Sequence, residues 1–271
     1  MKVFVTGGTG FVGREILGQL LSAGHEVRAL VRDGSQDKLS GHQNLETHIG
    51  DVTDAASLVG ALDGCDAVIH LVGIIREFPG RGITFKKMHV TATENILEAC
   101  DEQGVQRFLH MSSNGTRERG TTAYHRTKWQ AEELVRASGL DWTIFRPSLI
   151  FGRGSEFVKM LTELIRRVPV VPVIGDGQYR MQPVSVEQVA VSFVKALAMP
   201  ESVGKTYHQG GSESYTYDAI LDLTGKAMGR KHVTQVHQPL VMMRPMFKVL
   251  QGCELFAITE GRLKRLRAGE V

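Results

Sequence analysis

The sequence predicts an α/β protein in which a doubly wound parallel sheet is followed by a small C-terminal lobe. Short apolar runs alternate with segments of helical periodicity over residues 2–146, as in parallel strands joined by helices. The first run breaks directly into glycines, and the alternation changes from Phe151 onward. A chain of 271 residues is long enough for one large domain with a second lobe.

The first domain is expected to span residues 1–150. Its strands are predicted from residue 2 and over 26–31, 45–49, 66–71, 107–111 and 142–146. Its helices are predicted over 11–23, over 55–62, through Val90 to Cys100, and over 123–137. Right-handed crossovers bring the carboxyl ends of all parallel strands to one edge. The residues expected at that edge are Gly7, Arg32, Asp51, Gly73, Ser112 and Ser113.

The second lobe, expected over residues 151–271, is the predicted substrate-binding part. A helix, a Pro-rich strand over 168–174 and a Gly175-Asp-Gly177 turn typical of hairpins come first. An amphipathic helix over 186–199 is expected to pack back on the sheet. Residues 207–211 and a helix around 217–228 are expected to resume the lobe.

The glycines after the first strand stand at positions 7, 10 and 13. Gly7 allows a tight turn, Gly10 lets the backbone approach a pyrophosphate, and Gly13 lets the new helix pack against its strand. The free N–H groups and positive dipole end of that helix attract phosphates. The strand before and the helical spacing after favour a dinucleotide-binding turn over a merely structural one.

The choice of dinucleotide depends on the end of the second strand. An acidic side chain there commonly binds the adenosine ribose of NAD, but this chain has Arg32, which suits a 2′-phosphate. NADP(H) is therefore favoured over NAD(H), with Asp33 and a merely solvated Arg32 as the alternatives. Asp51 is placed to accept a hydrogen bond from the adenine amino group or to form a turn.

Tyr124 and Lys128 stand four residues apart on a predicted helix, so both side chains project from one face. A nearby ammonium lowers the high pKa of a phenol, which then exchanges a proton with a substrate hydroxyl or carbonyl. Ser113 ends the fifth strand at the same edge and is expected to orient the substrate oxygen, with Ser112 as its rival. These residues predict a catalytic set.

The same residues belong to a wider set of motifs. The motifs are Thr6-Gly-Gly-Thr-Gly-Phe-Val-Gly13, Gly50-Asp51-Val52, His70-Leu-Val-Gly73, Met111-Ser-Ser113, Tyr124-His-Arg-Thr-Lys128 and Arg146-Pro-Ser-Leu-Ile-Phe-Gly152. Over nearly its whole length, the chain resembles the short-chain dehydrogenase/reductase superfamily, in its extended and atypical branches of NAD(P)-dependent epimerase/dehydratase type. The resemblance implies a Rossmann fold, with Lys128 also holding the nicotinamide ribose and Pro147 against the carboxamide. The residues it implies around the cofactor are Thr6, Gly7, Thr9, Gly10, Phe11, Val12, Gly13, Arg32, Asp51, Val52, Leu71, Val72, Gly73, Met111, Ser112, Tyr124, Lys128 and Pro147.

Within this superfamily, residues 70–84 and 140–152 are most similar to the atypical group that contains the Rossmann-fold accessory subunit of respiratory complex I. That resemblance leaves two functions open: an NADP(H)-dependent oxidoreductase or epimerase, or a non-catalytic NADPH-holding assembly or redox-sensor protein. The chain departs from the extended pattern at His89, where Asn is usual, and at Met181-Gln182, where Arg-Asp is usual. Nucleotide-sugar substrates are therefore not expected.

Composition excludes several other classes of function. A net charge of +3 gives no argument for nucleic acid, and three scattered cysteines suggest neither a disulfide framework nor zinc. We expect a cytoplasmic protein without leader or membrane span, and with no metal. The Met-rich stretch 240–250 and the basic residues 262–267 leave peripheral membrane or respiratory-complex contact open. Arg76, Phe78 and Arg81 are expected in a loop over the nicotinamide, solvated by default.

Overall fold

The computed structural model describes residues 1–39 and 41–238 and divides the chain into two compact units. The first combines Met1–Pro147 with Val186–Gln209, and the second contains residues 148–185 and those from 210 onward. The Met-rich stretch 240–250, Cys253 and the basic residues 262–267 lie outside the described residues. In the part of the chain that is described, no helix is both long and apolar enough to cross a membrane.

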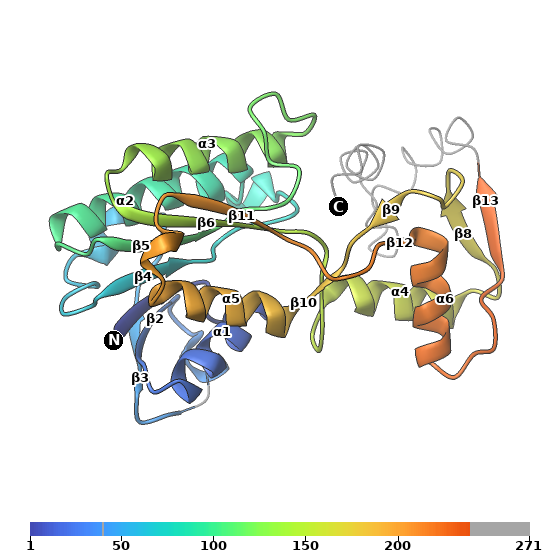
Figure 1. Cartoon of the computed structure of the whole chain (residues 1–271), viewed down its shortest axis with the longest axis horizontal. Coiled ribbons are helices and arrows are strands. Elements are labelled where there is room, and N and C mark those ends of the chain that lie inside the picture. Colours follow the sequence, from blue (N-terminus) through green and yellow to red (C-terminus); the bar gives the residue numbers. More distant parts are fainter. Residues whose placement is uncertain (40, 239–271) are drawn as a thin grey trace. The chain divides into compact units, whose positions relative to one another are not determined.

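A parallel sheet of seven strands forms the centre of the first unit, in the order β11-β6-β5-β4-β1-β2-β3 (Figure 1). The strands are β1 Lys2–Thr6, β2 Glu26–Val31, β3 Leu45–Ile49, β4 Ala67–His70, β5 Arg107–Met111, β6 Asp141–Pro147 and β11 Lys205–Gln209. The order reverses between β1 and β4, so a topological switch point lies at their carboxyl ends. Ligands of doubly wound sheets bind at such a point.

The edge strand β11 corrects one expectation. Residues 207–211 were expected to resume the second lobe, but Lys205–Gln209 instead pairs in parallel with residues 143–147 of β6. The segment carries only one large apolar side chain, Tyr207, which is 38% exposed. A polar strand of this kind suits a sheet edge, where one side of the ladder is open to water.

Helices cover both faces of the sheet (Figure 1). Helices α2 Ala92–Glu102 and α3 Ala123–Ala137 lie on one face, and α1 Phe11–Ser22 and α5 Val186–Leu197 lie on the other. Helix α5 buries Val186, Val189 and Phe193, which share one face at helical spacing. Arg107 of β5 secures the end of α5, because its guanidinium donates to the Ala196 carbonyl at 2.6 Å.

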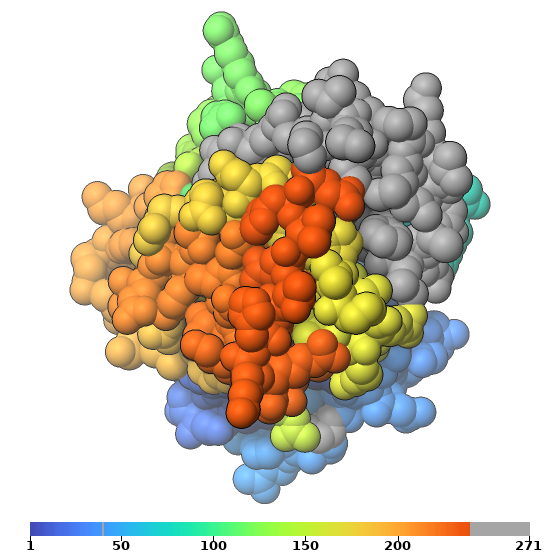
Figure 2. Space-filling model, turned by 90° about the vertical axis from the view of Figure 1, so that its right-hand side faces the viewer, coloured from blue at the N-terminus to red at the C-terminus, as the bar shows by residue number. Residues whose placement is uncertain are grey.

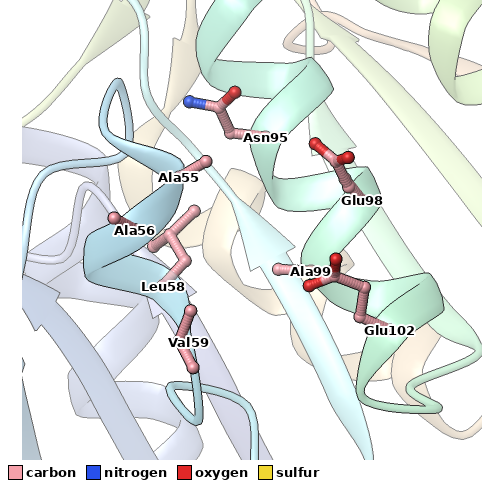
Figure 3. A pocket seen from close by; sticks show the side chains of 8 residues that line it. All are labelled: Ala55, Ala56, Leu58, Val59, Asn95, Glu98, Ala99 and Glu102. Atoms are coloured by element: carbon pink, nitrogen blue, oxygen red, sulfur yellow. The ribbon is translucent and has the colours of Figure 1, made fainter.

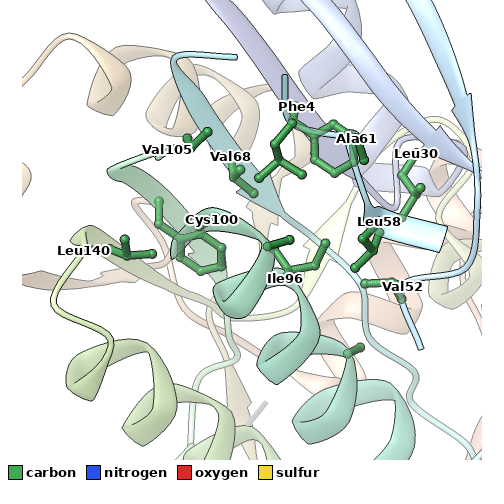
Figure 4. Close-up of a cluster of buried hydrophobic side chains, with 14 of the residues drawn as sticks. Phe4, Leu30, Val52, Leu58, Ala61, Val68, Ile96, Cys100, Val105 and Leu140 are labelled. Carbon is green, nitrogen blue, oxygen red and sulfur yellow. The ribbon is translucent and has the colours of Figure 1, made fainter. Parts of the chain in front are cut away.

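A cluster of buried apolar side chains fills much of the space between the sheet and α2 (Figure 4). Phe4, Val68 and Phe108 come from the neighbouring strands β1, β4 and β5, and Ile96 and Cys100 of α2 pack against this cluster. Fully burying one such side chain contributes about 1.5–3 kcal/mol, so this layer fixes the strands whose ends form the site.

Two helices differ from their predicted form. The helix expected over 55–62 is a single 3₁₀ turn, η2 Ala55–Leu58, because Gly60 and Gly64 adopt φ of 68° and 70° and stop it. The helix predicted through Val90 to Cys100 begins with a π-helical segment, η4 Lys86–Thr91, before α2. Such segments occur often at functional sites. The remaining 3₁₀ turns are η1 Gln36–Lys38, η3 Pro79–Arg81 and η5 Pro200–Ser202.

The second unit has its own core. Its helices and strands are β7 Ile150–Phe151, α4 Glu156–Arg167, β8 Val171–Ile174, β9 Arg180–Met181, β10 Val184–Ser185, β12 Tyr215–Thr216, α6 Tyr217–Ala227 and β13 Gln235–Gln238. Figure 2 shows residues of α6 and β13, in orange to red, beside those of α4 and β8, in yellow. The turn 175–177 does not form the expected hairpin, since β8 pairs in parallel with β13 instead.

Candidate functional site

The glycine turn between β1 and α1 is shaped for a close ligand. Gly7 has a φ of +77°, and a Cβ on Gly13 would lie 2.2 Å from the Gly7 carbonyl oxygen. Helix α1 begins after Gly10 with no side-chain cap and no acidic residue in its first turn. Its first N–H groups and positive end therefore remain available to an anion. This cradle fits a pyrophosphate.

The loop after β2 carries the predicted selectivity residue. Arg32 and Asp33 are both exposed, and Arg32 has no ion-pair partner in the described part of the chain. Ser35 is buried, and its hydroxyl oxygen lies 3.4 Å from the Lys38 ammonium. A second cation therefore shares this loop with Arg32. Sequence reasoning missed Ser35 and Lys38, although a lysine six residues after Arg32 was visible.

Asp51 after β3 forms a turn in the structure. Its Oδ1 accepts hydrogen bonds from the backbone and side chain of Thr53, each at 2.8 Å. The carbonyl oxygen of Val52 accepts one from Asn95 at 3.0 Å. The turn-forming alternative is thus observed, and the adenine contact stays a prediction.

A pocket of about 230 Å³ lies between η2 and α2 (Figure 3). Its lining residues are Ala55, Ala56, Leu58, Val59, Asn95, Glu98, Ala99 and Glu102. The carboxylates of Glu98 and Glu102 disfavour a phosphate group in this pocket. The glycine cradle suits the phosphates of a dinucleotide better.

Lys128 of α3 lies beside the ends of β4 and β5. The side chain is 3% exposed, and Nζ donates to the Met111 carbonyl oxygen at 2.9 Å. A Cβ on Gly73 would lie 2.9 Å from the same Nζ, so the backbone of the loop after β4 closely approaches the ammonium. Burial lowers the pKa of Lys128 to about 8, and the negative charge of Glu132 opposes that shift. Three predicted residues, Gly73, Met111 and Lys128, are therefore brought together.

Tyr124 stands one helical turn before Lys128, and its ring forms T-shaped contacts with the rings of Phe85, His89 and His125. The His89 ring lies 5.4 Å away at 85°, and the Phe85 ring lies 5.8 Å away at 78°. The imidazole of His89 is 2.9 Å from the Thr127 hydroxyl and 3.1 Å from the backbone N of Ile74. His89 therefore connects the loop after β4 to the helix that carries Tyr124.

The two ring nitrogens of His89 have different partners. Nδ1 forms a hydrogen bond with the Thr127 hydroxyl, which also donates to backbone carbonyls of its own helix. Nε2 lies 3.1 Å from both the backbone N and the carbonyl oxygen of Ile74. Burial, reinforced by Lys128, lowers the pKa of His89 to about 2, which keeps the ring neutral. The sequence marked His89 only as a departure from the family pattern, because a π-helical start is not readable from it.

The two serines after β5 differ in environment. Ser112 is 4% exposed and donates to a carboxylate oxygen of Glu132 at 2.5 Å. Ser113 is only partly buried, and its hydroxyl donates to the Asn114 carbonyl at 3.0 Å. The N–H of Asn114 donates to the carbonyl oxygen of Pro147 at 2.9 Å, which holds the ends of β5 and β6 together.

Glu132 is the centre of a buried ionic network that sequence reasoning missed. Its carboxylate is fully buried and accepts from Arg146 at 2.6 and 2.8 Å and from Arg136 at 2.5 Å. The Trp129 ring lies under both guanidiniums, at 4.9 and 5.8 Å. The network links α3 to β6 and to Ser112. Glu132 follows Lys128 by four residues, and this spacing indicates that both side chains lie on the same face of the helix.

Two further histidines lie inside the first unit. His70 accepts or donates a hydrogen bond with Thr6 at 2.8 Å, and its ring stacks on His110 at 5.5 Å. Burial lowers the pKa of His70 to about 3, so the pair is neutral core. Among residues 1–39 and 41–238, no group of three or more His, Cys, Asp or Glu side chains is arranged to hold a metal ion.

Comparison with known proteins identifies relatives of the first unit and of the whole chain. The sequence model of a family described as NAD(P)H-binding matches residues 7–200. A 3 beta-hydroxysteroid dehydrogenase/Delta 5-->4-isomerase of Mycobacterium tuberculosis is 33% identical over an alignment of length 224 that covers 73% of this chain and 60% of that protein. The mitochondrial NADH dehydrogenase [ubiquinone] 1 alpha subcomplex subunit 9 of Mus musculus is 30% identical, covering 98% of this chain and 72% of its own. The chain thus spans about 60% of the length of the mycobacterial relative.

Solved structures show the same fold. A UDP-glucuronic acid 4-epimerase variant from Bacillus cereus, bound to a fluorinated UDP-sugar and NAD, has a TM-score of 0.75 at 20% identity. That match covers 89% of this chain and 88% of the epimerase. A double mutant of the dTDP-glucose 4,6-dehydratase DesIV from Streptomyces venezuelae has a TM-score of 0.73 at 24% identity, and the match covers 88% of this chain and 85% of the dehydratase.

Proposed function

The chain belongs to the NAD(P)H-binding family, with the fold of the extended short-chain dehydrogenase/reductases, and from this we propose that it is an NADP(H)-dependent oxidoreductase. Its substrate is a carbonyl or alcohol group of a small molecule. The observation that carries the proposal is the buried Lys128 one helical turn after Tyr124, at the edge that also holds the glycine cradle. Epimerisation or dehydration through a keto form would use the same residues.

Residues of the first unit hold the pyrophosphate and the adenosine end of the cofactor. The cradle of Gly7, Gly10 and Gly13 binds the pyrophosphate. Arg32, with Lys38 in the same loop, binds a 2′-phosphate, which favours NADP(H) over NAD(H). When bound, NADP(H) supplies or accepts the hydride.

The remaining residues handle the proton and the substrate oxygen. Tyr124 exchanges a proton with that oxygen, and Lys128 follows it by one turn on the same face of α3. Since the pKa of Lys128 is about 8, the ammonium form prevails at neutral pH. Ser113 donates a hydrogen bond to the substrate oxygen, because the hydroxyl of Ser112 is already held by Glu132. Neutral His89 keeps the Tyr124 ring in place.

A second function is favoured by one comparison. The similarity to the mouse NADH dehydrogenase subunit covers 98% of this chain, more than the similarity to the mycobacterial dehydrogenase. The rival proposal is a non-catalytic protein that holds NADPH within an assembly.

Replacing Tyr124 by Phe separates the two functions. The assay follows NADPH oxidation with a panel of carbonyl compounds that includes quinones, and NADPH affinity by fluorescence. We expect Tyr124→Phe to lower turnover by about 10²–10⁴-fold without changing NADPH affinity, as for loss of a general acid. Tyr215→Phe, at a partly buried position in the second unit, is the matched control. Absence of NADPH oxidation by the wild type with every compound, or full cellular function of Tyr124→Phe, would favour the rival.

Replacing Arg32 by Ala tests the cofactor. We expect NADPH binding to weaken by about 1.5–3 kcal/mol, the contribution of a charge-assisted hydrogen bond, while NADH binding stays unchanged. An equal loss for both dinucleotides would contradict the assignment and would favour Asp33 as the ribose contact.

A further inference from the structure

The loop after β4, residues 74–85, is built as a compact hairpin. Phe78 and Ile83 exchange two backbone hydrogen bonds, at 2.8 and 3.2 Å. Gly82 closes the turn with a φ of +67°. A carboxylate oxygen of Glu77 accepts the N–H of Phe85 at 2.7 Å, which fixes the base of the hairpin. The loop therefore presents its outer side chains in a defined arrangement.

Those outer side chains are two arginines around one aromatic ring. The guanidinium carbon of Arg76 lies 5.3 Å from the centre of the Phe78 ring, and that of Arg81 lies 5.9 Å away. Phe78 is 41% exposed, and both arginines are exposed. Within the described residues, neither guanidinium forms an ion pair. Contact with the ring holds the cations close together without neutralising them.

The hairpin starts at the proposed reaction site. Gly73 lies against the Lys128 ammonium, and the backbone of Ile74 is hydrogen-bonded to His89. His89 in turn contacts the ring of Tyr124. A molecule whose oxygen reaches Tyr124 therefore has the hairpin as one of its neighbours.

Charge is concentrated at this part of the sheet edge. Residues 74–87 contain four basic side chains and one acidic side chain, and residues 114–126 contain three basic side chains and one acidic side chain. These loops follow the adjacent strands β4 and β5 and hold a surplus of five positive charges, whereas the whole chain has a surplus of three. The proposed phosphate contacts lie at the ends of the other two strands, β1 and β2.

We propose that Arg76, Phe78 and Arg81 bind the substrate as an amphipathic anion, with an apolar chain or ring that carries a carboxylate or phosphate group. The two guanidiniums hold the anionic group, since their planar N–H forks match its oxygens. The exposed edge of Phe78 contacts the apolar part. The inference rests on the proposed function, because it names the class of substrate that Tyr124 acts on.

The test uses decanoate as the probe and the full chain loaded with NADPH, with binding measured by calorimetry. Decanol is the neutral comparison. The double variant Arg76→Gln with Arg81→Gln is matched by Lys86→Gln with Lys87→Gln, which removes the same charge from exposed positions nearby but away from Phe78. We expect decanoate affinity to fall about tenfold in the arginine variant and less than twofold in the lysine variant. Phe78→Ala is expected to weaken decanoate and decanol alike.

Three outcomes would overturn the inference. An equal loss of decanoate affinity in both double variants would show that the general positive charge of the loop attracts the anion and that the two arginines have no specific role. If decanoate did not bind to the NADPH-loaded wild type, the inference about the substrate would fail and the proposed function would be unaffected. If NADPH itself did not bind, both the inference and the proposed function would fail. Arginine-dependent binding to phosphatidylglycerol vesicles in a sedimentation assay, without decanoate binding, would assign the hairpin to a membrane surface instead. Melting temperatures of all variants check that each is folded.

Discussion

Substituting Gly13 by Ala tests the glycine cradle more directly than any change at its rim. The new Cβ would lie 2.2 Å from the Gly7 carbonyl oxygen and 2.7 Å from the Gly8 Cα, although ordinary contacts begin at 3.4 Å. Both neighbours are backbone atoms, so the turn and α1 must move apart by about 1 Å. Overpacking of this kind costs about 1–3 kcal/mol, against a gain of about 1 kcal/mol for Ala over Gly within a helix.

Gly18 of the same helix provides the matched control. A Cβ there meets no atom within 4 Å, so Gly18→Ala is expected to stabilise the protein by about 0.5–1 kcal/mol. Thermal unfolding then shows a rise of about 2–4 °C for a gain near 1 kcal/mol. NADPH affinity is expected to remain unchanged in Gly18→Ala.

Fluorescence titration with NADPH measures the effect on the cradle. We expect at least tenfold weaker binding to Gly13→Ala, because the displaced helix no longer aims its first N–H groups at the pyrophosphate. The assignment of the cradle would be wrong if Gly13→Ala bound NADPH with the affinity of the wild type, or if its melting temperature equalled that of Gly18→Ala. In either case the close approach of α1 to the backbone of Gly7 and Gly8 would not be needed.

Two further predictions concern the buried charges behind the site. Because the pKa of Lys128 is about 8 when folded and 10.5 when unfolded, the unfolded chain binds more protons between these pH values, and stability rises with pH there. Measured by urea unfolding of the apo protein, the free energy of unfolding of the wild type should rise by about 3 kcal/mol relative to that of Lys128→Met between pH 8 and 10.5. If the two proteins showed the same dependence of stability on pH, the burial of the charge would be contradicted. Glu132→Gln should lower the free energy of unfolding by about 3–5 kcal/mol in the same assay, since it leaves Arg146 without its buried partner. Glu133, whose side chain is 55% exposed, is the control, and Glu133→Gln should lower the free energy of unfolding by less than about 1 kcal/mol. Equal losses would show that the Glu132 network is as weak as a surface pair.

Much of the first unit was predictable because its strands are short apolar runs bounded by turn residues. The strands over 26–31, 45–49 and 107–111 and the helix over 123–137 have their predicted bounds. Local signals of this kind suffice when neighbours in sequence decide the structure. The spacing of Tyr124 and Lys128 was readable for the same reason, since one helix face carries both.

The features that escaped prediction depend on contacts distant in sequence. The strand over 205–209 is polar, and only its pairing with β6 makes it part of the sheet. The environments of Ser112 and Ser113 differ because Glu132, twenty residues after Ser112, captures one hydroxyl. No local pattern indicates that α2 is preceded by the π-helical segment η4, which places the His89 ring against that of Tyr124.

The edge strand β11 has a consequence for the order in which the chain becomes able to fold during synthesis. The ribosome makes residues 148–185, which belong to the second unit, before α5 and β11, which belong to the first. Until residue 209 leaves the exit tunnel, β6 is an unpaired sheet edge of apolar character, a surface that chaperones recognise and that pairs readily with other chains. The synthesis of the two units is thus interleaved, because the first unit is completed only after residues 148–185 of the second have been made.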